Sequence, residues 1–229
     1  MSIHLIFDLL AALASVSLTV FLARGPLAEG LARVERIGWP WYAAFLIGAV
    51  WGAFALGTLN LVLSGTPGIG RSILGALIGA ILMVEIAKRV MGASGSTGIL
   101  FVPAFTLTTV IGRIGCFLSG LDDQTHGIPT ALPWGVDWGD GPRHPVQLYE
   151  SASMAMALVV WLWMIRWRPE AFRKYGFYLL CIAYGGERFL WEFLKPYGTV
   201  LGPLNVFHIG CLALIGYGTW MIARARKPA

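Results

Sequence analysis

Residues 99–118 read ILFVPAFTLTTVIGRIGCFL, an apolar run of membrane-spanning length with a single charge at Arg113. About twenty predominantly apolar residues form a helix long enough to cross a bilayer. An arginine at such depth costs roughly 2.5–3.5 kcal/mol, so it usually faces a protein interior or wet cavity and meets an anion. Residues 176–193 place Arg188 in a comparable run. We therefore expect a membrane protein in which these two arginines meet an anionic partner or substrate.

The composition of the chain supports this class. Of the 229 residues, 57% are hydrophobic and 13% are charged, and the mean hydropathy is +0.70. A soluble core of this size cannot hide so much apolar surface. We predict an all-α polytopic membrane protein with about seven transmembrane helices in a single domain, residues 1–229. The predicted spans are residues 3–23, 42–63, 72–87, 99–118, 148–164, 176–193 and 206–222.

Positive charges predict the orientation of these spans. They fall on alternate connections and on the C-terminal end, at Arg24, Arg33, Arg36, Lys88, Arg89, Arg166, Arg168, Arg173, Lys174, Arg224, Arg226 and Lys227. Loops rich in Lys and Arg face the cytoplasm, which places the N-terminus outside and the C-terminus in the cytoplasm. The first segment lacks a basic stretch before it, so we expect a retained span rather than a signal peptide. This bias accounts for most of the +5 net charge, and no nucleic-acid partner is expected.

The longest non-apolar segment lies between the fourth and fifth predicted spans. Residues 119–144 read SGLDDQTHGIPTALPWGVDWGDGPRH, with Gly, Pro and Asp at the frequency of turns. This segment is too short for a core of its own, so we expect a small extracytoplasmic cap on the membrane. The second and third spans contain WGAFALG and LGALIGA, whose small residues favour close helix packing.

The predicted orientation brings polar side chains from several spans to the outer leaflet. Arg113 and Arg188 lie toward the outer ends of two ascending spans, and two descending spans begin with further polar residues. These are Arg143, His144, Gln147, Tyr149 and Glu150 in RHPVQLYE, and Asn205 and His208 in LNVFHIG. The planar fork of arginine holds phosphate bidentately, so an anionic phospholipid headgroup is the natural occupant.

Other readings of these residues remain open. Glu192 follows Arg188 by four positions, so the two form either a structural ion pair or part of a lipid site. His144 and His208 are candidate bases or packing residues. Cys116, Cys181 and Cys211 have no metal-ligand spacing and are expected to pack in the spans. The aspartates of the cap and His126 suggest no metal cage, so we expect no metal and no cofactor.

Four motifs resemble the prolipoprotein diacylglyceryl transferase family. They are GRIGCFLSG at residues 112–120, LPWGV at 132–136, RHPVQLYE at 143–150 and YGGERFLWEF at 184–193. The resemblance implies a bacterial inner-membrane enzyme that moves the diacylglyceryl group of phosphatidylglycerol to a lipobox cysteine of a secreted preprotein. It also implies catalytic roles for Arg113, Arg188, His144 and Tyr184. Substrate contacts would come from Arg143, Gln147, Tyr149, Glu150, Glu192, Asn205 and His208.

The chain departs from the family pattern at several polar positions. Leu74 stands where members carry a histidine at the start of the third span, and Cys116, Ser119 and Leu121 replace two asparagines and a glutamate. The cap is also shorter than is typical of members. Two alternatives to the transferase therefore stay open. One is a catalytically silent lipid-binding subunit with partners in a membrane complex, and the other is a phospholipid-dependent transferase with a different acceptor.

Overall fold

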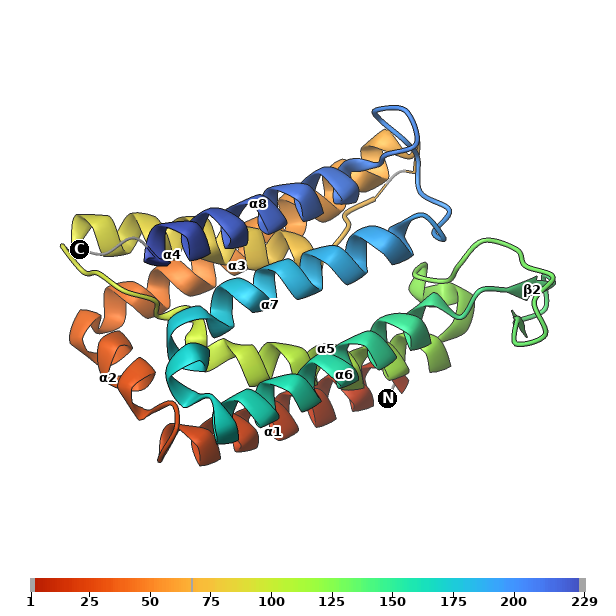
Figure 1. Cartoon of the computed structure of the whole chain (residues 1–229). Coiled ribbons are helices and arrows are strands. Elements are labelled where there is room, and N and C mark those ends of the chain that lie inside the picture. Colours follow the sequence, from red (N-terminus) through yellow and green to blue (C-terminus); the bar gives the residue numbers. More distant parts are fainter. Residues whose placement is uncertain (1–2, 67, 227–229) are drawn as a thin grey trace.

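The computed structural model describes residues 3–66 and 68–226, which fold mainly into helices (Figure 1). The α-helices are α1 (Ile3–Ala23), α2 (Ala28–Ile37), α3 (Trp39–Leu63), α4 (Ile73–Val90), α5 (Phe101–Leu118), α6 (Val146–Trp167), α7 (Pro169–Glu192) and α8 (Val206–Arg226). Two short 3-10 helices, η1 (Gly98–Leu100) and η2 (Gly120–Asp123), flank α5. Strands β1 (Val136–Asp137) and β2 (Pro142–Arg143) form a small antiparallel pair before α6.

The helices confirm an all-α, multi-pass membrane protein. Within the described residues, five helical segments are long and apolar enough to cross a bilayer: α1, α3, η1 with α5, α6 and α8. Helices α4 and α7, of 18 and 24 residues, cover the other two predicted spans, but they carry more charged residues, such as Glu85, Lys88 and Arg89 in α4. The number seven and the orientation in the membrane therefore remain predictions.

Helix α2 was not expected from the sequence, which predicted only a short connection between the first two spans. Its residues Gly30, Val34 and Ile37 are buried at helical spacing, while Glu29 begins the opposite, charged face. Ten residues with this pattern form an amphipathic helix that a search for spanning segments overlooks. The helix ends at Gly38, whose φ of 74° favours glycine.

The long helices pack in two layers (Figure 1). Helices α1, α5 and α6 lie together in one layer, and α3 and α4 pack against each other in the other layer, beside α7 and α8. A Cβ atom on Gly52 would lie 2.2 Å from the carbonyl oxygen of Gly75, and one on Gly48 would lie 2.3 Å from that of Gly79. The small residues of α3 and α4 thus allow the close backbone approach that the sequence predicted.

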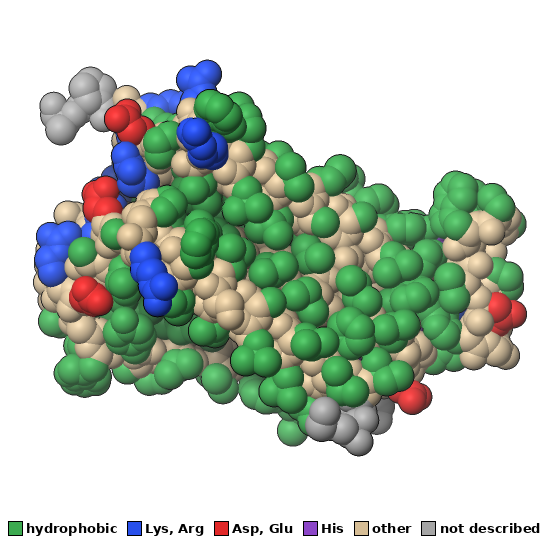
Figure 2. All heavy atoms as spheres, turned by 90° about the horizontal axis from the view of Figure 1, so that it is seen from below, with side chains coloured by type: hydrophobic (Ala, Val, Ile, Leu, Met, Phe, Trp, Pro, Cys, Tyr) green, Lys and Arg blue, Asp and Glu red, His purple; other side chains and the backbone are tan. Residues whose placement is uncertain are grey.

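The outer surface of the helices is largely apolar, as Figure 2 shows for one face. Large side chains such as Leu13, Phe21, Trp51 and Val159 are exposed over the helix bodies. Lys and Arg side chains gather at the end of the molecule where α2 and the C-terminal end of α8 lie. An apolar belt with cations at one end is the surface expected of a protein surrounded by lipid.

Candidate functional site

A buried carboxylate, Glu150 of α6, joins three basic side chains from different parts of the chain. Its Oε1 atom accepts hydrogen bonds from Arg188 Nη1 of α7 at 2.7 Å and from Lys195 Nζ at 2.8 Å. Its Oε2 atom forms an ion pair with Arg113 Nε of α5 at 2.8 Å. Only 1% of Glu150 is exposed. We call Arg113, Glu150, Arg188, Glu192 and Lys195 the ionic cluster.

Arg188 also connects the ionic cluster to the start of α8. Its Nε atom lies 3.1 Å from Glu192 Oε2, one turn later on α7. The other oxygen of Glu192 accepts a hydrogen bond from Asn205 Nδ2 at 3.1 Å. Asn205 Oδ1 in turn accepts the backbone N–H groups of Phe207 and His208, which satisfies donors in the first turn of α8. The predicted ion pair between Arg188 and Glu192 therefore exists, as one link of a longer network.

The guanidinium group of Arg113 has fewer protein partners than that of Arg188. Its Nε atom pairs with Glu150, and among the described residues its two terminal nitrogens make no hydrogen bond. Its side chain is 11% exposed, against 6% for Arg188. The terminal nitrogens of Arg113 thus form an uncommitted fork of the kind that binds phosphate bidentately.

Several buried polar atoms on the same helices also lack partners. Tyr184, one turn before Arg188, is 1% exposed, and its hydroxyl has no hydrogen-bond partner in the described part of the chain. The same holds for both amide atoms of Gln147 and both carboxylate oxygens of Glu187. Buried polar atoms are nearly always paired, so such a group of exceptions indicates a ligand or water that completes them.

An apolar cavity of about 300 Å³ lies between α3, α4, α5 and α7. Its walls include Phe45, Leu77 and Ile81, with a contribution from Tyr217 of α8. Phe105, another wall residue, packs edge-on against the ring of Tyr184 with a centroid distance of 4.8 Å. Phe105 therefore links the cavity wall to Tyr184, one turn before Arg188, while no residue of the ionic cluster lines the cavity itself. A cationic site and a separate space lined by hydrocarbon match the two ends of a phospholipid.

The predicted residues His144, Tyr149 and Arg143 belong to a different group at the edge of the cap. Tyr149 accepts a hydrogen bond from Trp134 Nε1 at 2.7 Å, and its hydroxyl lies 3.4 Å from His144 Nδ1. Arg143 donates to both carboxylate oxygens of Asp140 through Nε. Within the described residues, no hydrogen bond or ion pair joins this group to the ionic cluster.

His208 is buried on α8 beside Phe193 and is held by Asn205. Its Nδ1 atom lies 3.1 Å from the backbone nitrogen of Asn205 and 3.0 Å from Asn205 Oδ1, so the ring finds a partner at Nδ1 in either tautomer. Its Nε2 atom has no hydrogen-bond partner among the described residues.

The cap, residues 119–144, rests against the ends of α6 and α7. The backbone N–H of Ile128 donates to the carbonyl of Leu194 at 2.7 Å, and the N–H of His144 donates to the carbonyl of Ile128. Pro129 and Arg143 form an additional bridge beside strands β1 and β2. These backbone contacts fix where the RHPVQLYE motif enters α6, and with it the position of Glu150.

His126 of the cap makes the stability dependent on pH. Burial lowers its pKa from 6.5, and the charge of Arg143 lowers it further. The unfolded chain then takes up a proton near pH 6.5 that the folded cap resists, so stability falls as the pH decreases below 6.5. The hydrogen bond from Arg143 holds the pKa of Asp140 below 3.8, outside this range. We expect His126→Gln to flatten the dependence of the melting temperature on pH between 5 and 7, and an unchanged slope would contradict this.

Sequence reasoning missed Lys195 and Glu187 as members of the site. Lys195 is 5% exposed and binds the same oxygen of Glu150 as Arg188 does. The sequence feature that could have identified Lys195 is its position three residues after Glu192, directly after a predicted span. Leu74, at the position of the family histidine, is fully buried in the apolar core and offers no polar replacement.

Comparison with known proteins places these features in one family. The model of the prolipoprotein diacylglyceryl transferase family matches residues 49–224. A phosphatidylglycerol–prolipoprotein diacylglyceryl transferase of Nitratidesulfovibrio vulgaris strain Hildenborough is 34% identical over 185 residues, which cover 74% of this chain and 66% of the relative. The enzyme of that name from Methylococcus capsulatus is 32% identical over 166 residues, 68% of this chain and 62% of the relative.

The match includes all four motifs that carried the resemblance and the helices that hold the ionic cluster. The chain spans less than two thirds of the length of these curated relatives. The family model nevertheless covers well over half of the chain. The chain therefore belongs to the prolipoprotein diacylglyceryl transferase family.

Proposed function

We propose that this chain binds phosphatidylglycerol and transfers its diacylglyceryl group to the lipobox cysteine of a secreted preprotein. The observation that carries the proposal is the ionic cluster with the uncommitted fork of Arg113, in the same helical bundle as an apolar cavity of about 300 Å³. The printed names of the curated relatives describe this reaction for those proteins. In this account the chain works in the bacterial inner membrane, with the cap outside and the lipid drawn from the outer leaflet.

The reaction exchanges one bond at the terminal glycerol carbon of the diacylglyceryl group. The sulfur of the acceptor thiolate forms a bond to that carbon, and the carbon–oxygen bond to the phosphate breaks. The leaving oxygen takes the bonding electron pair and departs as part of glycerol phosphate, while the thiol proton passes to a base. Negative charge therefore grows on the phosphate, where fixed cations stabilise the transition state most effectively.

The residues of the ionic cluster have different roles in binding the phosphate and stabilising its charge. The terminal nitrogens of Arg113 bind the phosphate, and Arg188 supplies a second cation within the same cluster. Glu150 positions both guanidinium groups, because each uses one edge to contact its carboxylate. The buried hydroxyl of Tyr184 and amide of Gln147 have no hydrogen-bond partner among the described residues, and in this account they bond the headgroup.

We assign the acceptor side to the edge of the cap. His144 is half-buried beside Tyr149 and Trp134, where an arriving peptide meets the membrane surface, and it is our candidate base for the thiol. Arg143, held by Asp140, supports the same segment. Arg188 is oriented by its ion pair with Glu192, which in turn binds Asn205. Asn205 accepts the backbone N–H of His208, so all three residues help to fix the orientation of Arg188.

The direct test is turnover by the purified full chain. Incubation with phosphatidylglycerol and a lipobox peptide should release glycerol phosphate and add one diacylglyceryl mass to the peptide cysteine. Release without the peptide adduct would indicate another acceptor. Bound lipid without any turnover, together with stoichiometric co-purification of other membrane proteins, would favour the silent lipid-binding subunit. A peptide whose cysteine is replaced by serine is the matched control.

A further inference from the structure

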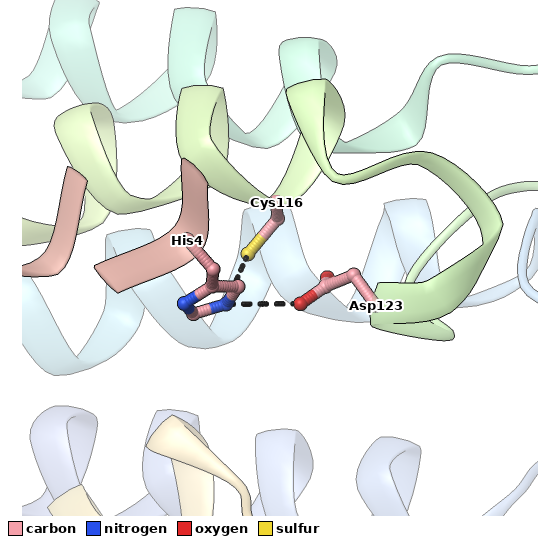
Figure 3. A group of neighbouring side chains, drawn as sticks. All are labelled: His4, Cys116 and Asp123. Carbon is pink, nitrogen blue, oxygen red and sulfur yellow. Dashed lines mark hydrogen bonds and ion pairs between the residues drawn. The ribbon is translucent and has the colours of Figure 1, made fainter. Parts of the chain in front are cut away.

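Three potential metal ligands meet at one end of the α1–α5 pair, apart from the ionic cluster (Figure 3). His4 comes from the first turn of α1, Cys116 from the last turn of α5 and Asp123 from η2. The Nε2 atom of His4 lies 2.9 Å from Asp123 Oδ1 and 3.8 Å from Cys116 Sγ. We propose that His4, Cys116 and Asp123 form a binding site for a zinc ion.

The ligand types and their spacing suit zinc. Imidazole nitrogen, thiolate sulfur and carboxylate oxygen are its usual protein ligands, with bonds of about 2.0–2.3 Å in tetrahedral geometry. Such bonds place neighbouring ligand atoms roughly 3.3–3.6 Å apart. The three candidate ligand atoms all lie within 4.8 Å of one another, and the two distances from His4 Nε2 differ from the ideal by only a few tenths of an ångström. Small rotations of these side chains therefore admit the ion.

A second observation concerns the other nitrogen of the His4 ring. Its Nδ1 atom lies 2.8 Å from Asp8 Oδ2, one turn along α1. Histidines that bind metals commonly donate this second N–H to a carboxylate, which fixes the tautomer and makes the ligating nitrogen more basic. In the zinc-bound state the proton would stay toward Asp8, and the imidazole would present its lone pair at Nε2, on the side where Cys116 and Asp123 lie (Figure 3).

Sequence spacing predicted no metal because these residues are far apart along the chain. His4 and Cys116 are separated by 112 positions, and the antiparallel packing of α1 on α5 brings them together. Contacts along the whole pair support that alignment, such as the hydrogen bond from Ser15 Oγ to the carbonyl of Ala104. A bound ion would cross-link α1, α5 and η2, and its three protein ligands leave a coordination position for water.

A purely structural ion triad is the competing explanation. In that arrangement a protonated His4 bridges Asp8 and Asp123, and Cys116 is a packing neighbour. The two accounts differ in what the thiol does. Zinc requires a deprotonated Cys116 that binds the ion, whereas in the ion triad Cys116 stays a neutral thiol beside His4.

The experiment titrates the full chain, stripped with a chelator in detergent micelles, with Co²⁺ as a spectroscopic probe and then with Zn²⁺. We expect one equivalent of Co²⁺ to produce a thiolate-to-cobalt charge-transfer band and tetrahedral ligand-field bands, both removed by Zn²⁺. Zn²⁺ should also raise the melting temperature. Cys116→Ser should abolish the charge-transfer band, and His4→Gln or Asp123→Asn should weaken binding.

Asp8→Asn provides the mildest test, because it leaves all three ligands in place. Loss of the carboxylate partner of a ligating histidine weakens metal binding by about 10–100-fold. The controls Cys181→Ala and His126→Gln change a cysteine and a histidine outside the cluster and should leave binding unchanged. No charge-transfer band in the wild-type chain, or the same band in Cys116→Ser, would overturn the proposal. Both readouts are independent of transferase activity.

Discussion

Glu150→Gln is expected to destabilise the folded protein by about 3–5 kcal/mol. This is the usual cost of removing one member of a buried ion pair, because the remaining charge stays buried without compensation. Here the loss affects Arg113, Arg188 and Lys195 together, and within the described part of the chain only Arg188 keeps an ion pair with a second carboxylate, that of Glu192. Gln has nearly the shape of Glu, so the change tests charge rather than packing. The measurement is the free energy of unfolding in a fixed detergent and lipid mixture.

The control for this prediction is an exposed ion pair on α2. Glu29 pairs with Arg33 one turn later, and its side chain is 57% exposed. Exposed pairs contribute about 0–1 kcal/mol, so Glu29→Gln should change the stability little. Combining Glu150→Gln with Lys195→Met should recover part of the loss, since one uncompensated cation is removed. Equal stability of Glu150→Gln and Glu29→Gln would contradict the role of Glu150 as the centre of the ionic cluster.

Arg113→Ala is expected to lower kcat of the proposed transfer by about 10²–10³-fold. Removal of one fixed group that stabilises developing charge typically has this effect. The fork of Arg113 is the uncommitted part of the ionic cluster, so its loss removes a phosphate contact from the transition state. Arg113→Lys keeps a charge but loses the bidentate geometry, and we expect it to recover only part of the rate.

The kinetic pattern separates this role from a structural one. An interaction made in the transition state lowers kcat and kcat/KM together, whereas lost ground-state binding raises KM alone. Arg71→Ala, which changes an exposed cation outside the ionic cluster, is the matched control and should keep the wild-type rate. Full activity of folded Arg113→Ala would show that Arg113 does not assist the departing phosphate.

The sequence predicted an all-α membrane protein and several of the polar residues that meet between its helices. Long apolar runs and isolated arginines are properties of the local sequence, and the penalty for charge in lipid identifies them without a structure. This is why Arg113, Arg188 and Glu150 could be assigned to one region in advance. The short helix α2 was missed because its ten residues carry charge on one face and are too few to span a membrane.

Side-chain contacts between different helices could not be predicted from one sequence. The contact of Glu150 with substrate stays a prediction, and its carboxylate holds three cations whose approach depends on how α5, α6 and α7 pack. The contact of Cys116 with His4 likewise depends on the alignment of α1 with α5. His144 and His208 were both candidate bases, and only the structure shows that His208 is buried at the start of α8 while His144 is half-buried at the edge of the cap.

The most direct measurement is an experimental structure of the full chain with phosphatidylglycerol bound. Our account predicts the phosphate within hydrogen-bond distance of the terminal nitrogens of Arg113, the Glu150 contacts retained, and an acyl chain in the cavity beside Phe105. A phosphate bound elsewhere, with Arg113 contacting only Glu150, would contradict the account and make the ionic cluster a structural element alone.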